Sequence, residues 1–162
     1  MKIEKELIGS MSVFGGLEDK DFELILSLAD ERIYSPGEVI VREGELDNLL
    51  YIIEEGEVIV EKARPGDGEN QPIIKLGTKD CFGEMSLIDP QPRAATVKAV
   101  LKTRVITLSA KAINDIYRSQ PKAYVIILMN LARQLSRRLR KAIEVIADLR
   151  AKANEALPHL KA

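Results

Sequence analysis

Residues 82–97 read FGEMSLIDPQPRAATV, and this stretch stands out because the helix-forming residues Glu84–Ile88 interrupt a series of strands. From Arg32 to Ser109 the surrounding pattern consists of short β-branched runs separated by turn residues about every ten positions, which is typical of a β-sandwich or barrel. A short helix inserted into such a domain is a candidate binding site, and its residues indicate what it binds.

The backbone of this stretch suits an anion. Gly83 precedes the predicted helix and allows close backbone approach, and the first turn of a helix presents unpaired N–H groups with a partial positive charge. Pro90 and Pro92 restrict the following loop, so it is stiff before anything binds. This loop carries Arg93, whose planar guanidinium matches two phosphate oxygens.

The neighbours of Arg93 narrow the class of ligand. Small alanines at 94 and 95 leave their N–H groups accessible, and Glu84 provides an acceptor for hydroxyl groups. A single arginine without a lysine cluster suits a singly charged phosphodiester better than a triphosphate, and neither GxxxxGK[ST] nor GxGxxG occurs in the chain. Taken alone, Glu84 and Arg93 are also compatible with a surface ion pair near a turn.

Helical periodicity flanks the β region. Glu18–Ala29 is predicted as an amphipathic helix with an acidic first turn, and Ala110–Arg118 as a second helix. One long helix is predicted from Pro121, which is tolerated in a first turn, to Leu157, where Pro158 ends it. Helices at both ends of a β domain predict an α+β architecture.

The long helix carries a second pattern, which fits either a core helix of a monomer or the seam of an oligomer. A compact β domain is about 30 Å across, whereas this helix would run about 55 Å, so its end must project. We therefore expect a parallel homodimer, although alanines in the seam leave other oligomeric states open. The apolar positions alternate spacings of four and three over roughly four heptads: Leu128, Ala132, Leu135, Leu139, Ala142, Ile146, Leu149, Ala153 and Ala156.

Composition indicates one ordinary globular domain, because the chain has 162 residues, of which 46% are hydrophobic and 30% are charged. Lysine and arginine number 24 and aspartate and glutamate 25, a formal net charge of -1, so nucleic acid is not indicated. The basic run at 137–141 is followed by Glu144 and Asp148 at helical spacing, which favours a solvated face over phosphate binding.

The sequence also lacks signals for a metal site, a membrane span or a signal peptide. The single cysteine, Cys81, and the single histidine, His159, cannot build a disulfide framework, a structural zinc site or an iron–sulfur cluster. We expect Cys81 to be a buried, inert thiol. The longest apolar run, Ala123–Met129, is too short for a membrane span, and the first residues lack the apolar stretch of a signal peptide. We therefore expect a cytoplasmic protein with no metal and no membrane partner.

Residues 82–97 resemble the phosphate-binding cassette of the cyclic nucleotide-binding domain family, whose members include protein kinase A regulatory subunits, cyclic-nucleotide-gated channels and bacterial catabolite activators. The resemblance is to the family's F-G-E…P-R-A-A-T-V signature and extends from Phe14 to about Ala142. Supporting matches are PGEVI at 36–40, EGE at 43–45, LYII at 50–53, EGEV at 55–58, and Leu76-Gly77 ahead of Asp80.

The resemblance implies a specific α+β fold: N-terminal helices, an eight-stranded jelly-roll-like β-roll (a double-stranded β-helix), a short cassette helix and a long C-terminal helix. We expect residues 1–120 to form the cyclic nucleotide-binding β-roll with its N-terminal helices. Residues 121–162 would form a lid and dimerisation helix of the same domain.

The resemblance also implies roles residue by residue. Arg93 would bind the cyclic phosphate with the two alanine amides that follow it, and Glu84 would bind the ribose 2′-hydroxyl with the Gly83 backbone. The base would lie in the β-roll under the long helix. The predicted ligand-binding residues of this segment are Gly83, Glu84, Met85, Ser86, Arg93, Ala94 and Ala95.

Departures from the family pattern refine these expectations. In the bacterial activators two hydroxyl residues of the long helix contact the adenine, whereas the aligned positions here are Ala142 and Ile143, so base contact would be apolar. Arg138 aligns with an arginine that reaches the cassette glutamate, which implies a latch to Glu84. In cGMP-selective members a threonine often follows the cassette arginine, whereas Ala94 does so here; cAMP is favoured as the regulatory ligand, and cGMP stays open.

Bacterial activators continue past the long helix into a winged helix-turn-helix, whereas only five residues, Pro158–Ala162, follow it here, so we expect no DNA partner. No motif orients the acidic residues for acid–base chemistry, so we expect no enzyme. The sequence predicts a stand-alone cyclic nucleotide sensor that signals through its C-terminal helix to a downstream protein which it does not identify. The alternative is a nucleotide-independent dimerisation scaffold that keeps the fold and has lost the ligand.

Overall fold

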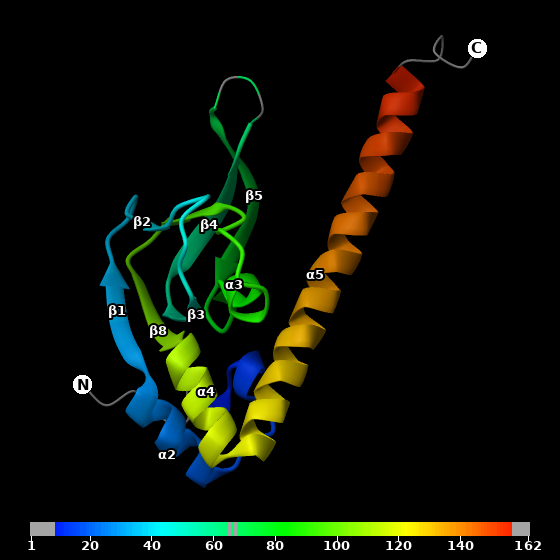
Figure 1. Cartoon of the computed structure of the whole chain (residues 1–162). Helices are drawn as coiled ribbons and strands as arrows, with labels where there is room; N and C mark the ends of the chain where they lie inside the picture. Colours follow the sequence, from blue (N-terminus) through cyan, green and yellow to red (C-terminus); the bar gives the residue numbers. More distant parts are fainter. Residues whose placement is uncertain (1–8, 65, 67, 157–162) are drawn as a thin grey trace.

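The computed structural model describes residues 9–64, 66 and 68–156, and Figure 1 shows a β-roll with short helices at its base and one long helix that runs past it. The described strands form two four-stranded antiparallel sheets, in the orders β1-β8-β3-β6 and β2-β7-β4-β5. Except for the hairpin of β4 and β5, consecutive strands alternate between the two sheets. The eight-stranded β-roll is confirmed. Its strands are β1 (Asp30–Tyr34), β2 (Val39–Val41), β3 (Leu49–Glu55), β4 (Glu57–Ala63), β5 (Asn70–Gly77), β6 (Cys81–Phe82), β7 (Thr96–Ala99) and β8 (Thr103–Ser109).

The described helices match the predicted α+β architecture closely. The cassette helix α3 has the predicted bounds, both ends of α2 differ from prediction by one residue, and α4 begins as predicted and ends one residue later. Leu157, Pro158 and His159, on which the predicted helix end and tail depended, lie outside the described residues. The helices are η1 (Ser12–Phe14, a 3₁₀ turn), α2 (Asp19–Leu28), α3 (Glu84–Ile88), α4 (Ala110–Ser119) and α5 (Pro121–Ala156).

Two apolar clusters divide the interior. One lies where η1, α2, α4 and the first half of α5 pack on the sheet of β3 and β8, with Phe14, Ile106 and Ile127 fully or almost fully buried. The other lies between the two sheets and includes Ile53 and Val97. The first cluster fixes where α5 leaves the β-roll, because Ile127 and Leu131 are anchored in it.

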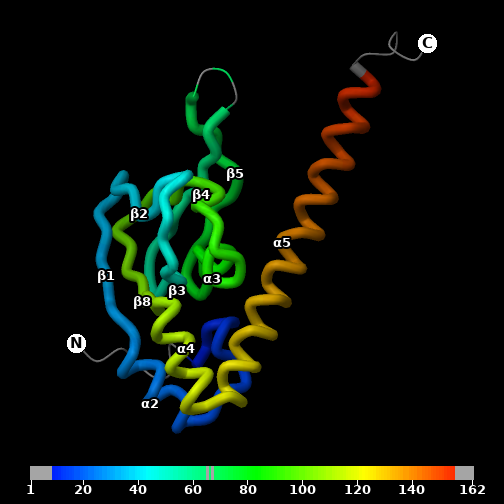
Figure 2. Tube along the Cα trace, in the orientation of Figure 1, coloured from blue at the N-terminus to red at the C-terminus, as the bar shows by residue number. Residues whose placement is uncertain are grey.

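The long helix α5 has two different halves. Up to Gln134 one side is buried against the core, whereas every residue from Leu139 to Glu155 is exposed. Figure 2 shows this second half standing apart from the β-roll. Leu139, Ile146 and Leu149 of the predicted seam are all more than half exposed. Among the described residues, no helix combines the length and the hydropathy of a membrane span, because charged side chains recur along α5.

Candidate functional site

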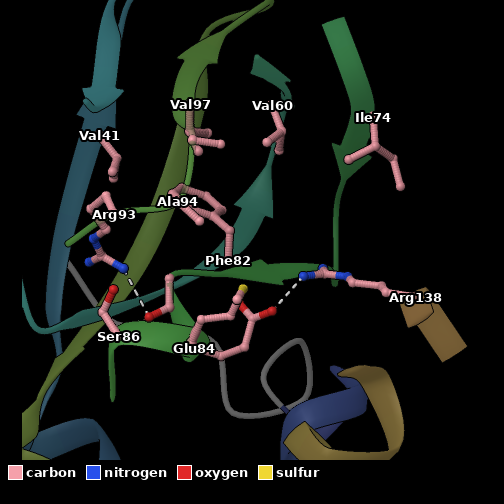
Figure 3. A pocket seen from close by; sticks show the side chains of 13 residues that line it. Val41, Val60, Ile74, Phe82, Glu84, Ser86, Arg93, Ala94, Val97 and Arg138 are labelled. Atoms are coloured by element: carbon pink, nitrogen blue, oxygen red, sulfur yellow. Dashed lines mark hydrogen bonds and ion pairs between the residues drawn. The ribbon is translucent and has the colours of Figure 1, made fainter. Parts of the chain in front are cut away.

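A pocket lies between the inner face of the β2-β7-β4-β5 sheet, the cassette helix α3 and one side of α5 (Figure 3). It collects the seven ligand-binding residues predicted in the cassette, together with Arg138 from α5. Strand residues supply the remaining wall. The lining residues are Val41, Val60, Ile74, Phe82, Gly83, Glu84, Met85, Ser86, Arg93, Ala94, Ala95, Val97 and Arg138.

The pocket has a polar side and an apolar side. Figure 3 shows the side chains of Val41, Val60, Ile74 and Val97 gathered on the strands, with Glu84 and Arg138 below them. An apolar wall favours a flat, weakly polar group, whereas fixed charged groups favour an anion with neighbouring hydroxyls. The arrangement suits a ligand that has a hydrophobic part and a phosphate-bearing part.

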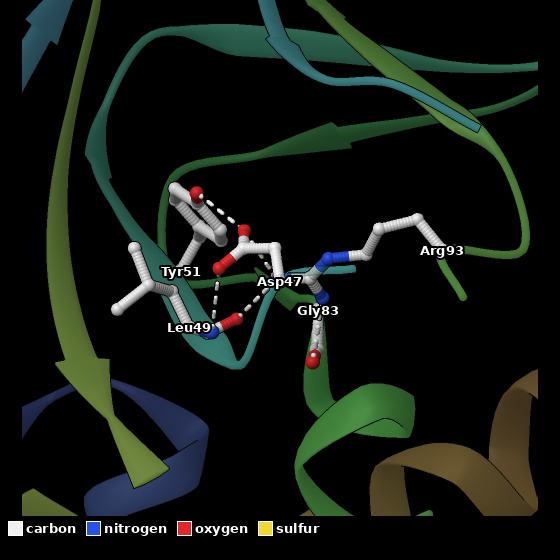
Figure 4. Close-up of polar contacts among 5 residues, drawn as sticks. All are labelled: Asp47, Leu49, Tyr51, Gly83 and Arg93. Atoms are coloured by element: carbon white, nitrogen blue, oxygen red, sulfur yellow. Dashed lines mark hydrogen bonds and ion pairs between the residues drawn. The ribbon is translucent and has the colours of Figure 1, made fainter. Parts of the chain in front are cut away.

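Arg93 is almost completely buried, with 4% of its surface exposed. Its Nη1 donates to the Gly83 carbonyl at 2.9 Å, and its Nη2 donates to Asp47 Oδ2 at 2.8 Å and to the Leu49 carbonyl at 2.7 Å (Figure 4). Its Nε is buried and donates to no partner within the described part of the chain. A buried donor without an acceptor costs free energy. The guanidinium is therefore rigidly held: three of its five N–H groups donate to the acceptors named above, which leaves the Nε–H and one N–H of Nη1 to offer.

Asp47 is the main site residue that sequence reasoning missed. Besides Arg93, it accepts from the Tyr51 hydroxyl at 3.0 Å and from the Leu49 backbone N–H at 3.1 Å. Burial by itself raises the pKa of Asp47, but the hydrogen bond and charge of Arg93 outweigh it and hold the pKa below its usual value. The carboxylate thus stays ionised and fixes the arginine. The available signal was an aspartate two residues before a strand, where its side chain can accept from that strand's first N–H.

Gly83 is required where Arg93 meets the cassette helix. Its φ of 84° lies in the left-handed region, and a Cβ at this position would stand 2.6 Å from both Arg93 Nη1 and the Leu49 carbonyl oxygen. Any other residue would displace the arginine or the backbone of β3. The predicted close approach of the Gly83 backbone to an anion stays a prediction, whereas the structure shows a close approach of Arg93 to Gly83.

Glu84 and Arg138 form the predicted latch between the cassette helix and α5. Arg138 Nη1 donates to Glu84 Oε1 at 2.8 Å, and Arg138 Nη2 donates to the Cys81 carbonyl. The Glu84 side chain is almost fully buried, whereas Arg138 is about a quarter exposed. One turn earlier on α5, Gln134 accepts from the Cys81 thiol at 2.7 Å. Both contacts fasten α5 to the edge of the pocket.

The Cys81 thiol itself is not reactive. It lies buried between β6 and α5, and burial raises its pKa to about 12. A thiol that stays protonated at neutral pH is a poor nucleophile and a poor metal ligand. Among the described residues, His, Cys, Asp and Glu side chains nowhere gather in a group of three that could hold a metal ion.

Ala142 is the one predicted ligand-binding residue that the structure does not bring to the pocket. It is exposed, one turn beyond Arg138, in the half of α5 that stands apart from the β-roll. Ile143 is also exposed, at 57%. Contact of either residue with a base stays a prediction that needs a ligand or a second chain beside this half of the helix.

The family model described as "Cyclic nucleotide-binding domain" matches residues 31–120, which are more than half of the chain. The chain belongs to the cyclic nucleotide-binding domain family. The matched region contains all eight strands of the β-roll except the first residue of β1, together with the cassette helix and α4. Arg93 and Glu84 lie within the matched region.

Known proteins and structures agree with this assignment. The cyclic AMP receptor protein of Thermus thermophilus is 34% identical over 80% of this chain and 58% of its own length. The structure of a cyclic nucleotide-binding domain from Methylobacillus flagellatus KT matches with a TM-score of 0.79 and 29% identity over 88% of this chain and 80% of that one. The structure of the regulatory domain of Toxoplasma gondii protein kinase A with cAMP matches with a TM-score of 0.62 and 30% identity, over 68% and 42% of the two chains. The domain thus spans less than two thirds of the Thermus relative.

Proposed function

We propose that the pocket binds a 3′,5′-cyclic nucleotide as a regulatory ligand and that it prefers cAMP to cGMP. The observation that carries this proposal is the state of Arg93. Both Nη groups are already held by protein acceptors, while the buried Nε lacks a partner among the described residues and belongs to a residue that lines the pocket. A phosphate oxygen would satisfy that donor, and the amides of Ala94 and Ala95 would add further donors nearby.

The ribose would lie against Glu84. A carboxylate offers about four lone-pair sites, so Glu84 can accept from a ribose hydroxyl while Oε1 stays bound to Arg138. The ligand would then bind the one residue of the cassette helix that also holds α5 through Arg138.

The base would face the apolar wall of Val41, Val60, Ile74 and Val97. Guanine has more polar edge groups than adenine, and burying them against aliphatic side chains without partners is costly. Ala94 has no hydroxyl that could bind guanine. The Toxoplasma regulatory domain, whose structure holds cAMP, supports cAMP as a ligand of this fold.

The exposed half of α5 would provide the output. Leu139, Ile146 and Leu149 present an unpaired apolar seam, which a second copy of the chain would cover in a parallel homodimer. We propose a non-enzymatic sensor of the cytoplasm that signals through this helix to a downstream protein. Ala142 belongs to the same seam, so the partner helix of such a dimer would lie beside it.

Titration calorimetry with cAMP, cGMP and 5′-AMP tests the proposal. We expect cAMP to bind more tightly than cGMP, and 5′-AMP to bind weakly because its doubly charged, acyclic phosphate does not match a single held arginine. A dimeric protein that binds none of the three would contradict the proposal and support the alternative, a nucleotide-independent dimerisation scaffold.

A further inference from the structure

Lys62 at the end of β4 contacts the cassette from outside the pocket. Its ammonium donates to Glu43 Oε1 at 2.6 Å and to the Ala94 carbonyl at 2.7 Å. About half of its side chain is exposed, and it is not among the residues that line the pocket. Nothing in the sequence pattern distinguishes this lysine, because a lysine near the end of an apolar strand is common on protein surfaces.

Glu43 holds Lys62 in place more firmly than an ordinary surface partner would. Its second carboxylate oxygen accepts from the Ala63 N–H at 3.1 Å, and its own N–H donates to Thr96 Oγ1 at 3.1 Å. The hydrogen bond from Lys62, followed by the one from Ala63, lowers the pKa of Glu43. The carboxylate therefore stays charged. Glu43 is held at its carboxylate and at its backbone N–H, which limits the positions that the lysine can adopt.

The carbonyl of one peptide unit in the pocket wall is bound by Lys62. The Ala94–Ala95 peptide is trans, so its N–H points opposite to its C=O. Because the Ala94 carbonyl points to Lys62, the Ala95 N–H points away from Lys62. The preceding unit is held in the same manner, since the Gly44 N–H donates to the Arg93 carbonyl at 2.9 Å. Both peptide units that offer alanine amides are thus anchored through their carbonyls.

We propose that Lys62, tethered by Glu43, is a positioning residue for the phosphate of the ligand. It keeps the Ala94–Ala95 peptide in one orientation and, by binding the carbonyl with a positive charge, strengthens the amide of the same unit as a donor. This inference rests on the proposed function, since it assumes that the cassette binds a phosphate. It assigns to β4 a part in binding beyond the apolar wall that Val60 provides.

A simpler explanation of any effect of Lys62 is long-range attraction between its charge and the anionic ligand. The two explanations differ at Glu43. Replacing Glu43 with Gln removes a negative charge, so simple attraction predicts tighter binding. Positioning predicts weaker binding, because the neutral amide no longer holds Lys62 on the Ala94 carbonyl.

Lys75 of β5 offers a matched control. Its ammonium donates to Glu57 Oε1 at 2.8 Å, in an ion pair of similar exposure on the same sheet. Glu57 is not among the lining residues of the pocket. Lys75→Met therefore removes the same charge and the same kind of ion pair without touching the cassette.

The test is calorimetric titration of cAMP into the full chain and its variants, each shown to be folded by circular dichroism. We expect Lys62→Met to weaken binding about tenfold, Glu43→Gln to weaken it severalfold, and Lys75→Met to change it less than about twofold. Lys62→Arg should restore most of the affinity, because the guanidinium can still bridge both acceptors. Unchanged affinity in Lys62→Met, or tighter binding in Glu43→Gln, would overturn the role of Lys62 and leave the proposed function intact. A wild-type chain that binds neither cAMP nor cGMP would overturn both.

Discussion

Arg138 of α5 and Glu84 of α3 form an ion pair, with 2.8 Å between Nη1 and Oε1, that ties the long helix to the cassette helix. The same arginine donates to the Cys81 carbonyl. A ligand that binds Glu84 therefore acts on a residue that also holds α5. A ligand shifts a helix only by binding its two positions with different affinity, and the shared carboxylate is the contact at which that difference can arise.

Arg138→Met should destabilise the fold by about 2 kcal/mol, because it leaves the buried Glu84 carboxylate without its charged partner. Arg137→Met is the matched control, since Arg137 is the adjacent arginine on α5 and is exposed; its effect should stay within about 0.5 kcal/mol. Urea unfolding of both variants measures the difference. Equal stabilities would show that the latch contributes nothing to the fold.

Gly83→Ala should cost more than Gly37→Ala, although the two glycines share a φ of 84°. At Gly37 nothing lies within 4 Å of an added Cβ. The free energy of unfolding of this variant should therefore fall by only about 1–2 kcal/mol, the cost of the strained backbone. At Gly83 the added carbon would collide with Arg93 and the β3 backbone, so the variant should also lose cyclic nucleotide binding. Thermal unfolding and calorimetry test this pair, and equal losses in both variants would argue against the close approach.

The Asp47 carboxylate should raise the free energy of unfolding at neutral pH more than at acidic pH. Its pKa is lower in the folded state than its ordinary value of 3.8, so its contribution is present above that value and is lost as the pH falls through the folded pKa. Asp47→Asn lacks this contribution. The difference in unfolding free energy between wild type and variant should therefore shrink when urea unfolding is moved from about pH 7 to about pH 3. A difference that does not vary with pH would contradict the ion pair with Arg93.

Ile146→Lys should convert the proposed dimer to monomer, because a two-fold interface contains each substituted position twice. Val145→Lys is the control, since Val145 is exposed to a similar degree but lies outside the heptad seam. Sedimentation equilibrium should show a weaker association for the first variant alone. If both variants remain as dimeric as the wild type, the interface lies elsewhere.

Much of the fold was predictable because its signals are local. Turn residues at regular intervals indicate seven or eight strands, Gly83 and the prolines bound the cassette helix, and Pro121 with the heptads predicts α5. The family resemblance also predicted the latch between Glu84 and Arg138, residues that are far apart in the sequence and that α5 brings together.

The remaining parts of the site depend on contacts that no local pattern encodes. Asp47 and Lys62 reach the cassette only after the β-roll has closed, when β4 lies beside β7 and the loop before β3 meets Arg93. For Ala142 the alignment predicts a position that the direction of α5 does not give. Its alignment places it over the base, whereas the direction of α5 follows from the packing of Ile127 and Leu131 in the core, which carries Ala142 away from the pocket.

The most direct test of the account is the affinity of Arg93→Lys for cAMP, measured by calorimetry beside the wild type. Lysine keeps the charge, but a single ammonium cannot hold the Gly83 carbonyl, the Asp47 carboxylate and a phosphate oxygen in the geometry of the guanidinium. The account predicts that the wild type binds cAMP and that the folded variant binds it more weakly by about 2–5 kcal/mol. An unchanged affinity in the folded variant would contradict the assignment of the phosphate to Arg93.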